Sequence, residues 1–116
     1  MASEVVVLTR EDGRVVCEHL LVAARPFQRM RGLLGRRSLP AGEGILLRPA
    51  GSVHMFFMRF AIDAIFLDRD LVVIDIVRDL RPWKTAGRRG AKAVVELASG
   101  ECDRRGIKPG DALALS

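Results

Sequence analysis

Short hydrophobic runs separated by turn-forming residues recur along the chain, and this pattern favours strands over helices. Valine-rich segments at 4–9 and 15–22 flank Asp12 and Gly13, so they predict an opening β-hairpin. Further strands are predicted at 45–47, 61–67, 71–77, 93–97 and 112–115. The tight connection at 68–70 predicts a second hairpin between the two runs that it joins.

Two segments depart from this pattern and predict short helices. Residues 26–35 begin with a proline, end with a glycine and carry apolar residues at helical spacing. A single helical turn is expected at 101–105, followed by a glycine. Residues 79–92 are rich in Arg, Lys, Gly and Pro without periodicity, which predicts an exposed basic loop around Trp83.

These elements together predict a mainly β (α+β) fold, either a small curled antiparallel sheet or a partly open β-barrel with one or two short helices. With 116 residues, 49% of them hydrophobic, we expect one domain over residues 1–116. No apolar run approaches the roughly 20 residues that cross a membrane, and no basic region precedes the first apolar run. We therefore expect a cytoplasmic protein, although a mature fragment of an exported protein would look the same.

The segment 54–68 sets three ionisable side chains, His54, Arg59 and Asp63, into a very apolar run that contains four of the five Phe residues. Buried charges are costly unless they are paired and hydrogen-bonded, so these groups need a structural partner or a ligand. In an extended chain Arg59 and Asp63 share one face. His54 has the opposite parity and would join them through a bulge.

We therefore predict a ligand-binding pocket formed by His54, Arg59, Asp63 and Trp83. Arg59 would clamp an anionic group of a small ligand or peptide, Asp63 would orient Arg59 or accept a donor, and the Phe and Met side chains would supply an apolar wall. Trp83 would cover the pocket. The alternative is structural: Arg59 and Asp63 pair with each other or bond loop backbone, and Trp83 packs its loop onto the barrel.

The formal net charge is +5, and 16 of the 19 basic residues are arginine. This bias suits the recognition of phosphate or carboxylate groups, although GC-rich codon usage produces it as well. Arg88, Arg89 and Lys92 are candidates for binding nucleic acid or an acidic partner. Only Trp83 is interleaved with the basic residues, so this alternative has less support.

Most familiar catalytic motifs are missing from the sequence, including the P-loop, GxGxxG, GxSxG and HExxH. Cys17 and Cys102 lack metal-ligand spacing, and we expect buried free thiols, with one long-range disulfide as the alternative. We expect no metal site and no cofactor. Whether the protein is an enzyme stays open, because His54 as general base with Arg59 would suit a hydrolase or transferase, and Cys17 with His19 or His54 would suit a nucleophile pair.

Several motifs, taken in order, resemble a widespread prokaryotic family, domain of unknown function 192. They are residues 31–35 (RGLLG), 54–60 (HMFFMRF), 62–68 (IDAIFLD), 80–83 (LRPW), 95–100 (VELASG) and 106–111 (GIKPGD). The resemblance implies a compact β-rich domain with a small helix. It carries no activity over, because the family's biochemical role is not established. Relatives often have Gly in the 68–71 connection, where this chain has Asp70 and Leu71, so the local turn type differs.

Overall fold

The computed structural model describes residues 4–23 and 36–116, which form nine strands and one short helix. The elements are β1 (Glu4–Arg10), β2 (Val15–Ala23), β3 (Glu43–Leu47), β4 (Ser52–His54), β5 (Ile62–Leu67), β6 (Val73–Leu80), β7 (Thr85–Gly87), β8 (Ala93–Ala98), α2 (Glu101–Arg105) and β9 (Leu113–Leu115). Seven strands make one sheet in the order β6-β5-β8-β3-β2-β1-β9, and β4 pairs with β7 in a separate ribbon. All pairs are antiparallel except β2 with β3.

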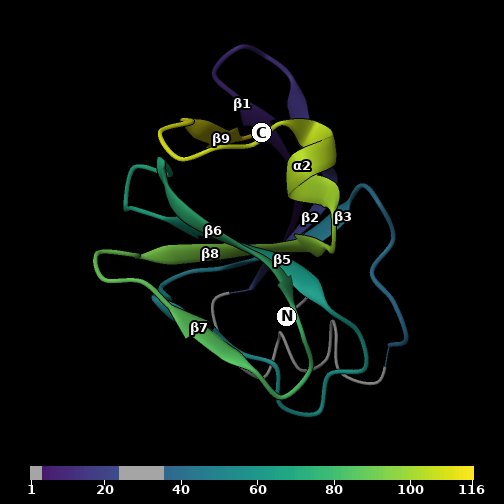
Figure 1. The fold of residues 1–116 in the computed structure, drawn as a ribbon. Coiled ribbons are helices and arrows are strands. Elements are labelled where there is room, and N and C mark those ends of the chain that lie inside the picture. The colour runs from purple at the N-terminus through teal and green to yellow at the C-terminus, as the bar shows by residue number, and fades with distance from the viewer. Residues whose placement is uncertain (1–3, 24–35) are drawn as a thin grey trace.

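The large sheet curls until its two edge strands touch at one corner (Figure 1). An isolated bridge joins Val72 to Ala112, and the Val73 N–H donates to the Asp111 carbonyl at 2.8 Å. The Leu113 N–H donates to the Leu71 carbonyl at 3.0 Å. The fold is therefore a partly open barrel of strands with one short helix in the described part, which confirms the predicted fold class.

Hydrophobic residues fill two cores, one inside the curl and one on its outer face. The inner core receives side chains from all seven strands of the large sheet and from α2, among them Leu8, Leu20, Leu46, Ile65, Ile76, Leu97, Cys102 and Leu113. The outer core lies between β3, β5 and β8 and the β4–β7 ribbon, and includes Ile45, Val53, Met55, Phe66 and Val94. Because β5 is buried on both faces, all six of its residues are buried and its sequence is almost continuously apolar.

The structure confirms both predicted hairpins and the helical turn at 101–105. The prediction that residues 79–92 form one exposed loop was wrong, because β6 continues to Leu80 and β7 occupies 85–87. β7 has three residues and no hydrophobic period, and it forms because Ala86 lies opposite Val53 of β4. The predicted helix at 26–35 lies outside the described residues. Within the described ranges, no helix is long and apolar enough to cross a membrane.

Both cysteines are free and buried, as the sequence predicted. The Cys17 thiol donates to the Gly42 carbonyl at 3.3 Å, and burial raises its pKa from an ordinary value of 9.0 to about 11. Burial, together with the nearby Asp63 carboxylate, also raises the pKa of Cys102. The protein therefore favours the protonated thiol at both positions.

We expect dithionitrobenzoate at about pH 8 to label both thiols only after unfolding in guanidinium, since the reactive species is the thiolate. Because the pKa of Cys17 is higher in the folded protein than in the unfolded chain, protonation of this thiol contributes to the free energy of unfolding. The contribution is fully present below the ordinary thiol pKa and is lost as the pH rises from 9.0 toward about 11. Rapid labelling of one thiol in the folded protein would contradict this description.

Candidate functional site

An aromatic cluster forms where the loop after β4 meets the loop before β7. Its members are His54, Phe56, Phe57 and Trp83. The rings of His54 and Phe56 stack with centroids 4.8 Å apart, and Phe56 lies 6.0 Å from Trp83. Phe57 meets the edge of Trp83 at 5.0 Å. The cluster thus brings together two of the four residues predicted for the site, His54 and Trp83, through Phe56.

Met55 joins the two loops through its backbone hydrogen bonds. Its side chain is completely buried, and its N–H donates to the Lys84 carbonyl at 2.8 Å. Its carbonyl accepts from the N–H groups of Trp83 at 2.8 Å and Met58 at 3.3 Å. The β4–β7 pairing therefore passes directly into the two loops, and the aromatic side chains stand on a hydrogen-bonded base.

Phe57 and Trp83 both have a left-handed backbone, with φ of 65° and 70°. This conformation is rare for bulky side chains and costs about 1–2 kcal/mol per residue. Burial does not offset that cost, because Phe57 is 70% exposed and Trp83 60% exposed, with Phe56 at 42%. Strained backbone that presents large apolar rings to solvent is typical of functional surfaces.

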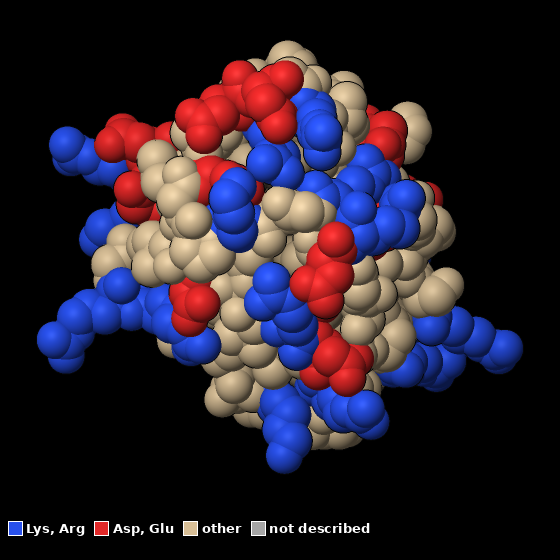
Figure 2. Space-filling model, turned by 45° about the horizontal axis from the view of Figure 1, so that its top comes forward, with Lys and Arg blue, Asp and Glu red and all other residues tan. Residues whose placement is uncertain are grey.

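The cations nearest the cluster in sequence differ in whether they pair with a carboxylate. Arg59 follows the first loop, Lys84 follows Trp83, and both are exposed without an acidic partner among the described residues. Arg81 instead pairs with Asp79 at 3.2 Å. On the face drawn in Figure 2, basic side chains are interleaved with acidic ones and do not gather into one patch. Exposed cations without a described acidic partner therefore neighbour the cluster in sequence, as they also occur at Arg69, Arg89 and Lys92.

Asp63 makes its hydrogen bonds with segments other than the two loops of the aromatic cluster. It lies on β5, is fully buried, and accepts three backbone hydrogen bonds of 3.0 Å each. One oxygen accepts from the N–H of Asp79, and the other from the N–H groups of Gly100 and Cys102 at the start of α2. Gly100 has no side chain with which to cap the helix, so the Asp63 carboxylate does so. This arrangement matches the structural alternative for Asp63 and sets it apart from the His54–Trp83 surface.

Phe56 and Phe57 were not among the predicted site residues, because their side chains were assigned to an apolar wall. Phe56 and Phe57 occupy the two central positions of a turn closed by the hydrogen bond from the Met58 N–H to the Met55 carbonyl, and the outer core receives Met55 and Met58 instead. The neighbouring Phe pair in a segment without strand periodicity is the signal that could have identified them.

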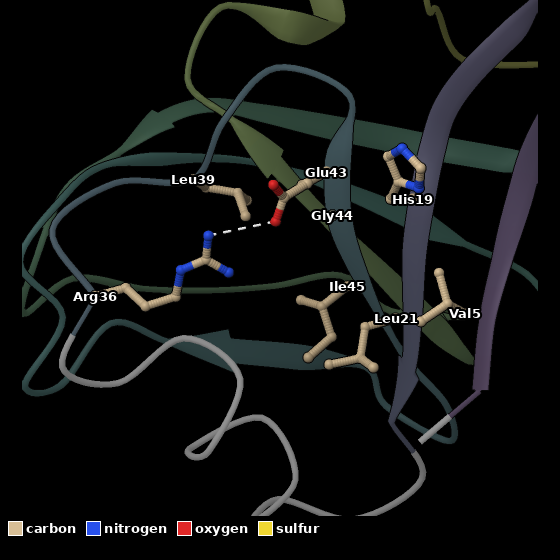
Figure 3. Close-up of a pocket in the computed structure, with 8 residues that line it drawn as sticks. All are labelled: Val5, His19, Leu21, Arg36, Leu39, Glu43, Gly44 and Ile45. Atoms are coloured by element: carbon tan, nitrogen blue, oxygen red, sulfur yellow. Dashed lines mark hydrogen bonds and ion pairs between the residues drawn. The ribbon is translucent and has the colours of Figure 1, made fainter. Parts of the chain in front are cut away.

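A separate recess of about 250 Å³ lies on the outer face of β1, β2 and β3 (Figure 3). His19 of β2 stands opposite Glu43 of β3, and Glu43 pairs with Arg36 at 3.3 Å. The remaining lining residues are Val5, Leu21, Leu39, Gly44 and Ile45. His19 therefore belongs to a different surface from His54. Among the described residues, no group of three or more His, Cys, Asp or Glu side chains is placed to hold a metal ion.

The sequence is similar to a known protein family along nearly its whole length. The profile of DUF192, described as "Uncharacterized ACR", matches residues 7–115. This chain belongs to the DUF192 family. It is 32% identical over 111 residues to a UPF0127 protein of Thermococcus sibiricus, covering 91% of this chain and 71% of that protein. A UPF0127 protein of Pyrococcus furiosus is 41% identical over 63 residues, which is 53% of each chain.

Two solved structures share the fold. A protein from Sinorhizobium meliloti 1021, described as a "putative transcription regulator", superposes with a TM-score of 0.83 at 25% identity, covering 99% of this chain and 96% of that one. A protein of unknown function from Novosphingobium aromaticivorans has a TM-score of 0.79 at 28% identity, covering 97% of this chain and 84% of that one. The family and the fold predicted from the sequence motifs are thus both confirmed.

Proposed function

We propose that this DUF192 protein is a cytoplasmic binding module whose binding surface is the aromatic cluster. Its ligand carries a ring or planar group that stacks on the aromatic side chains and an anionic group that the neighbouring cations attract. The observation that carries the proposal is the joint exposure of Phe57 and Trp83 on strained backbone. The two free thiols suit a reducing compartment.

Each part of the surface has a distinct role in this proposal. The exposed faces of Phe57 and Trp83 contact the ring of the ligand, and His54 with Phe56 supports Trp83 from behind. Arg59 and Lys84 supply positive charge that is not already taken by a described carboxylate. Asp63 acts at a distance from the ligand by fixing α2 against β5.

Trp83 makes the proposal directly testable, because it is the one tryptophan of the chain and there is no tyrosine. We expect phenyl phosphate and benzoate to change its fluorescence saturably, and inorganic phosphate and acetate to do so far more weakly, since they have no ring. Arg59→Ala should weaken phenyl phosphate binding about tenfold, the value of one charge-assisted hydrogen bond.

Arg69→Ala is the matched control, because Arg69 is exposed in the β5–β6 turn at the far end of β5. It should leave the binding of phenyl phosphate unchanged. If Arg59→Ala unfolds the protein, Arg59 is structural. If neither ring compound perturbs Trp83, the surface does not bind ring anions and the proposal is lost.

A basic surface at Arg88, Arg89 and Lys92 is the second candidate, for nucleic acid or an acidic partner. Arg88 donates to Asp75 at 2.6 Å and also lies 5.5 Å from the Phe66 ring centroid, so its charge is already engaged. Arg89 and Lys92 stay exposed. The description of the Sinorhizobium protein as a "putative transcription regulator" is compatible with this candidate.

An enzymatic role has less support from the geometry. The Cys17 thiol faces the inner core, bonds a carbonyl and has a raised pKa, which is the opposite of an activated nucleophile. His54 stacks on Phe56 at an exposed position of β4. A general base needs a substrate held within hydrogen-bond distance, and the described recess is lined by His19 and not by His54.

A further inference from the structure

We infer that the ligand of the aromatic cluster is single-stranded nucleic acid, with bases stacked on Phe57 and Trp83 and phosphates held by Lys84, Arg59 and Arg89. The inference rests on the proposed function and names the ligand class. Exposed rings that accept any base, combined with cations along the path of the backbone, are the usual components of such a surface.

The rings of the cluster lie in two orientations. His54 and Phe56 are inclined by 27°, and Phe56 and Trp83 by 33°, so these three ring planes are close to parallel. Phe57 stands at 62° to Trp83. The cluster therefore presents two differently oriented and largely exposed apolar faces, which suits two successive bases that are turned relative to each other.

Exposed cations lie at both ends of the β4–β7 ribbon. Arg59 and Lys84 lie at the cluster end of the β4–β7 ribbon, while Arg89 and Lys92 lie at its other end, where the Arg88 N–H donates to Gly51 and the Ala50 N–H donates to Lys92. Arg59, Lys84, Arg89 and Lys92 are exposed and have no acidic partner among the described residues. In contrast, Arg78, Arg88 and Arg105 each bond a carboxylate at 2.7 Å or less.

The β4–β7 ribbon itself connects these two groups of cations. The ribbon has three residue pairs, which is about 10 Å at the usual rise of a strand. Val53 and Ala86 face the outer core, so the outward positions belong to Ser52, Thr85 and Gly87, which are small, together with His54. The His54 ring is the one large side chain of the ribbon on this outward side, so a sugar–phosphate backbone can pass beside it over Ser52, Thr85 and Gly87 toward Arg89.

Other ligand classes fit these observations less well. An acidic peptide matches the cations but does not require two exposed ring faces. A membrane surface could take up Trp83 and Phe57 while Lys84 and Arg81 reach to the headgroups, but it makes no use of ring planes that lie close to parallel. Duplex DNA keeps its base faces stacked inside the helix, so it cannot use the rings.

The experiment measures binding of a fluorescein-labelled oligothymidylate of about 15 nucleotides, within the site sizes known for such surfaces. We expect an anisotropy rise together with quenching of Trp83. Trp83→Ala should weaken binding at least tenfold, and Trp83→Phe should restore part of the loss because a ring is retained. Lys84→Glu should weaken binding and lower the slope of log affinity against log salt by about 0.7, the value per phosphate contact on a single strand.

Arg69→Glu and Val5→Ala are the matched controls, for charge and for exposed apolar area away from the cluster, and both should bind as the parent protein does. A duplex of the same length should bind more weakly than the single strand. Equal binding of duplex and single strand, or equal loss in Arg69→Glu, would overturn the stacking model. Binding to phosphatidylserine vesicles or to polyglutamate, with no binding to the oligonucleotide, would replace nucleic acid by a membrane or an acidic partner. If phenyl phosphate perturbs Trp83 and the oligonucleotide does not bind, the proposed function stands and this inference fails.

Discussion

Replacing Asp63 by asparagine is expected to lower the free energy of unfolding by about 2–4 kcal/mol. Both carboxylate oxygens accept hydrogen bonds in a fully buried position, one from Asp79 and the other from Gly100 and Cys102. An asparagine side chain must turn its NH₂ group toward one of these two sets of N–H donors. At least one buried N–H then loses its acceptor and faces another donor.

Asp68→Asn is the matched control for this substitution. Asp68 also accepts two backbone N–H groups, from Asp70 at 2.8 Å and Val72 at 3.0 Å, but both bonds use the same oxygen. An asparagine can keep that oxygen in place, so we expect a loss below about 0.5 kcal/mol. Equilibrium unfolding in urea, with unchanged slope, measures both. Equal losses for the two variants would show that the second oxygen of Asp63 contributes nothing.

Truncating Met55 to alanine is expected to cost about 2–5 kcal/mol, the usual range for a buried methionine. The side chain is completely buried in the outer core, directly below the loops that carry the aromatic cluster. The cavity left behind removes the packing that supports the Met55 backbone, whose N–H and carbonyl join the loops at Lys84 and Trp83. We therefore expect the emission of Trp83 to change in the folded variant as well.

Met55→Leu is the matched control, because it replaces the side chain while nearly keeping its volume. Leucine nearly conserves the volume and should cost less than about 1.5 kcal/mol while keeping the parent emission spectrum. Urea unfolding and tryptophan fluorescence of the folded state give the two measurements on the same samples. A destabilised Met55→Ala variant with an unchanged Trp83 spectrum would mean that the cluster does not depend on the core beneath it.

Those parts of the fold that depend on local signals could be predicted from the sequence. The first hairpin turns at Gly13 with φ of 86°, and α2 ends at Gly106 with φ of 67°, both positions where glycine was expected to end an element. β7 could not be predicted in this way. It carries no hydrophobic period, and it exists because β4, which is distant in sequence, presents Val53 to Ala86.

The candidate site was likewise predicted only in the part that depends on local sequence. His54 and Trp83 were predicted to share a surface, and the structure joins them through Phe56. Asp63 was predicted to face the same side as Arg59, which assumes a regular strand through both residues. β5 begins only at Ile62, after an irregular segment, and the donors that engage Asp63 come from later in the chain. A pattern confined to residues 54–68 contains no information about those donors.

The pairing of β1 with β9 has a consequence for how the protein is made. One edge of β1 pairs with β2, which follows it directly in the chain, but the other pairs with β9 at the far end of the fold, as the reciprocal bonds between Val7 and Ser116 show. Loop closure over so long a separation is slow. During that time the free edge can pair with another chain. Residues 4–10 therefore form an open edge strand in any folding intermediate in which β9 has not yet paired with β1.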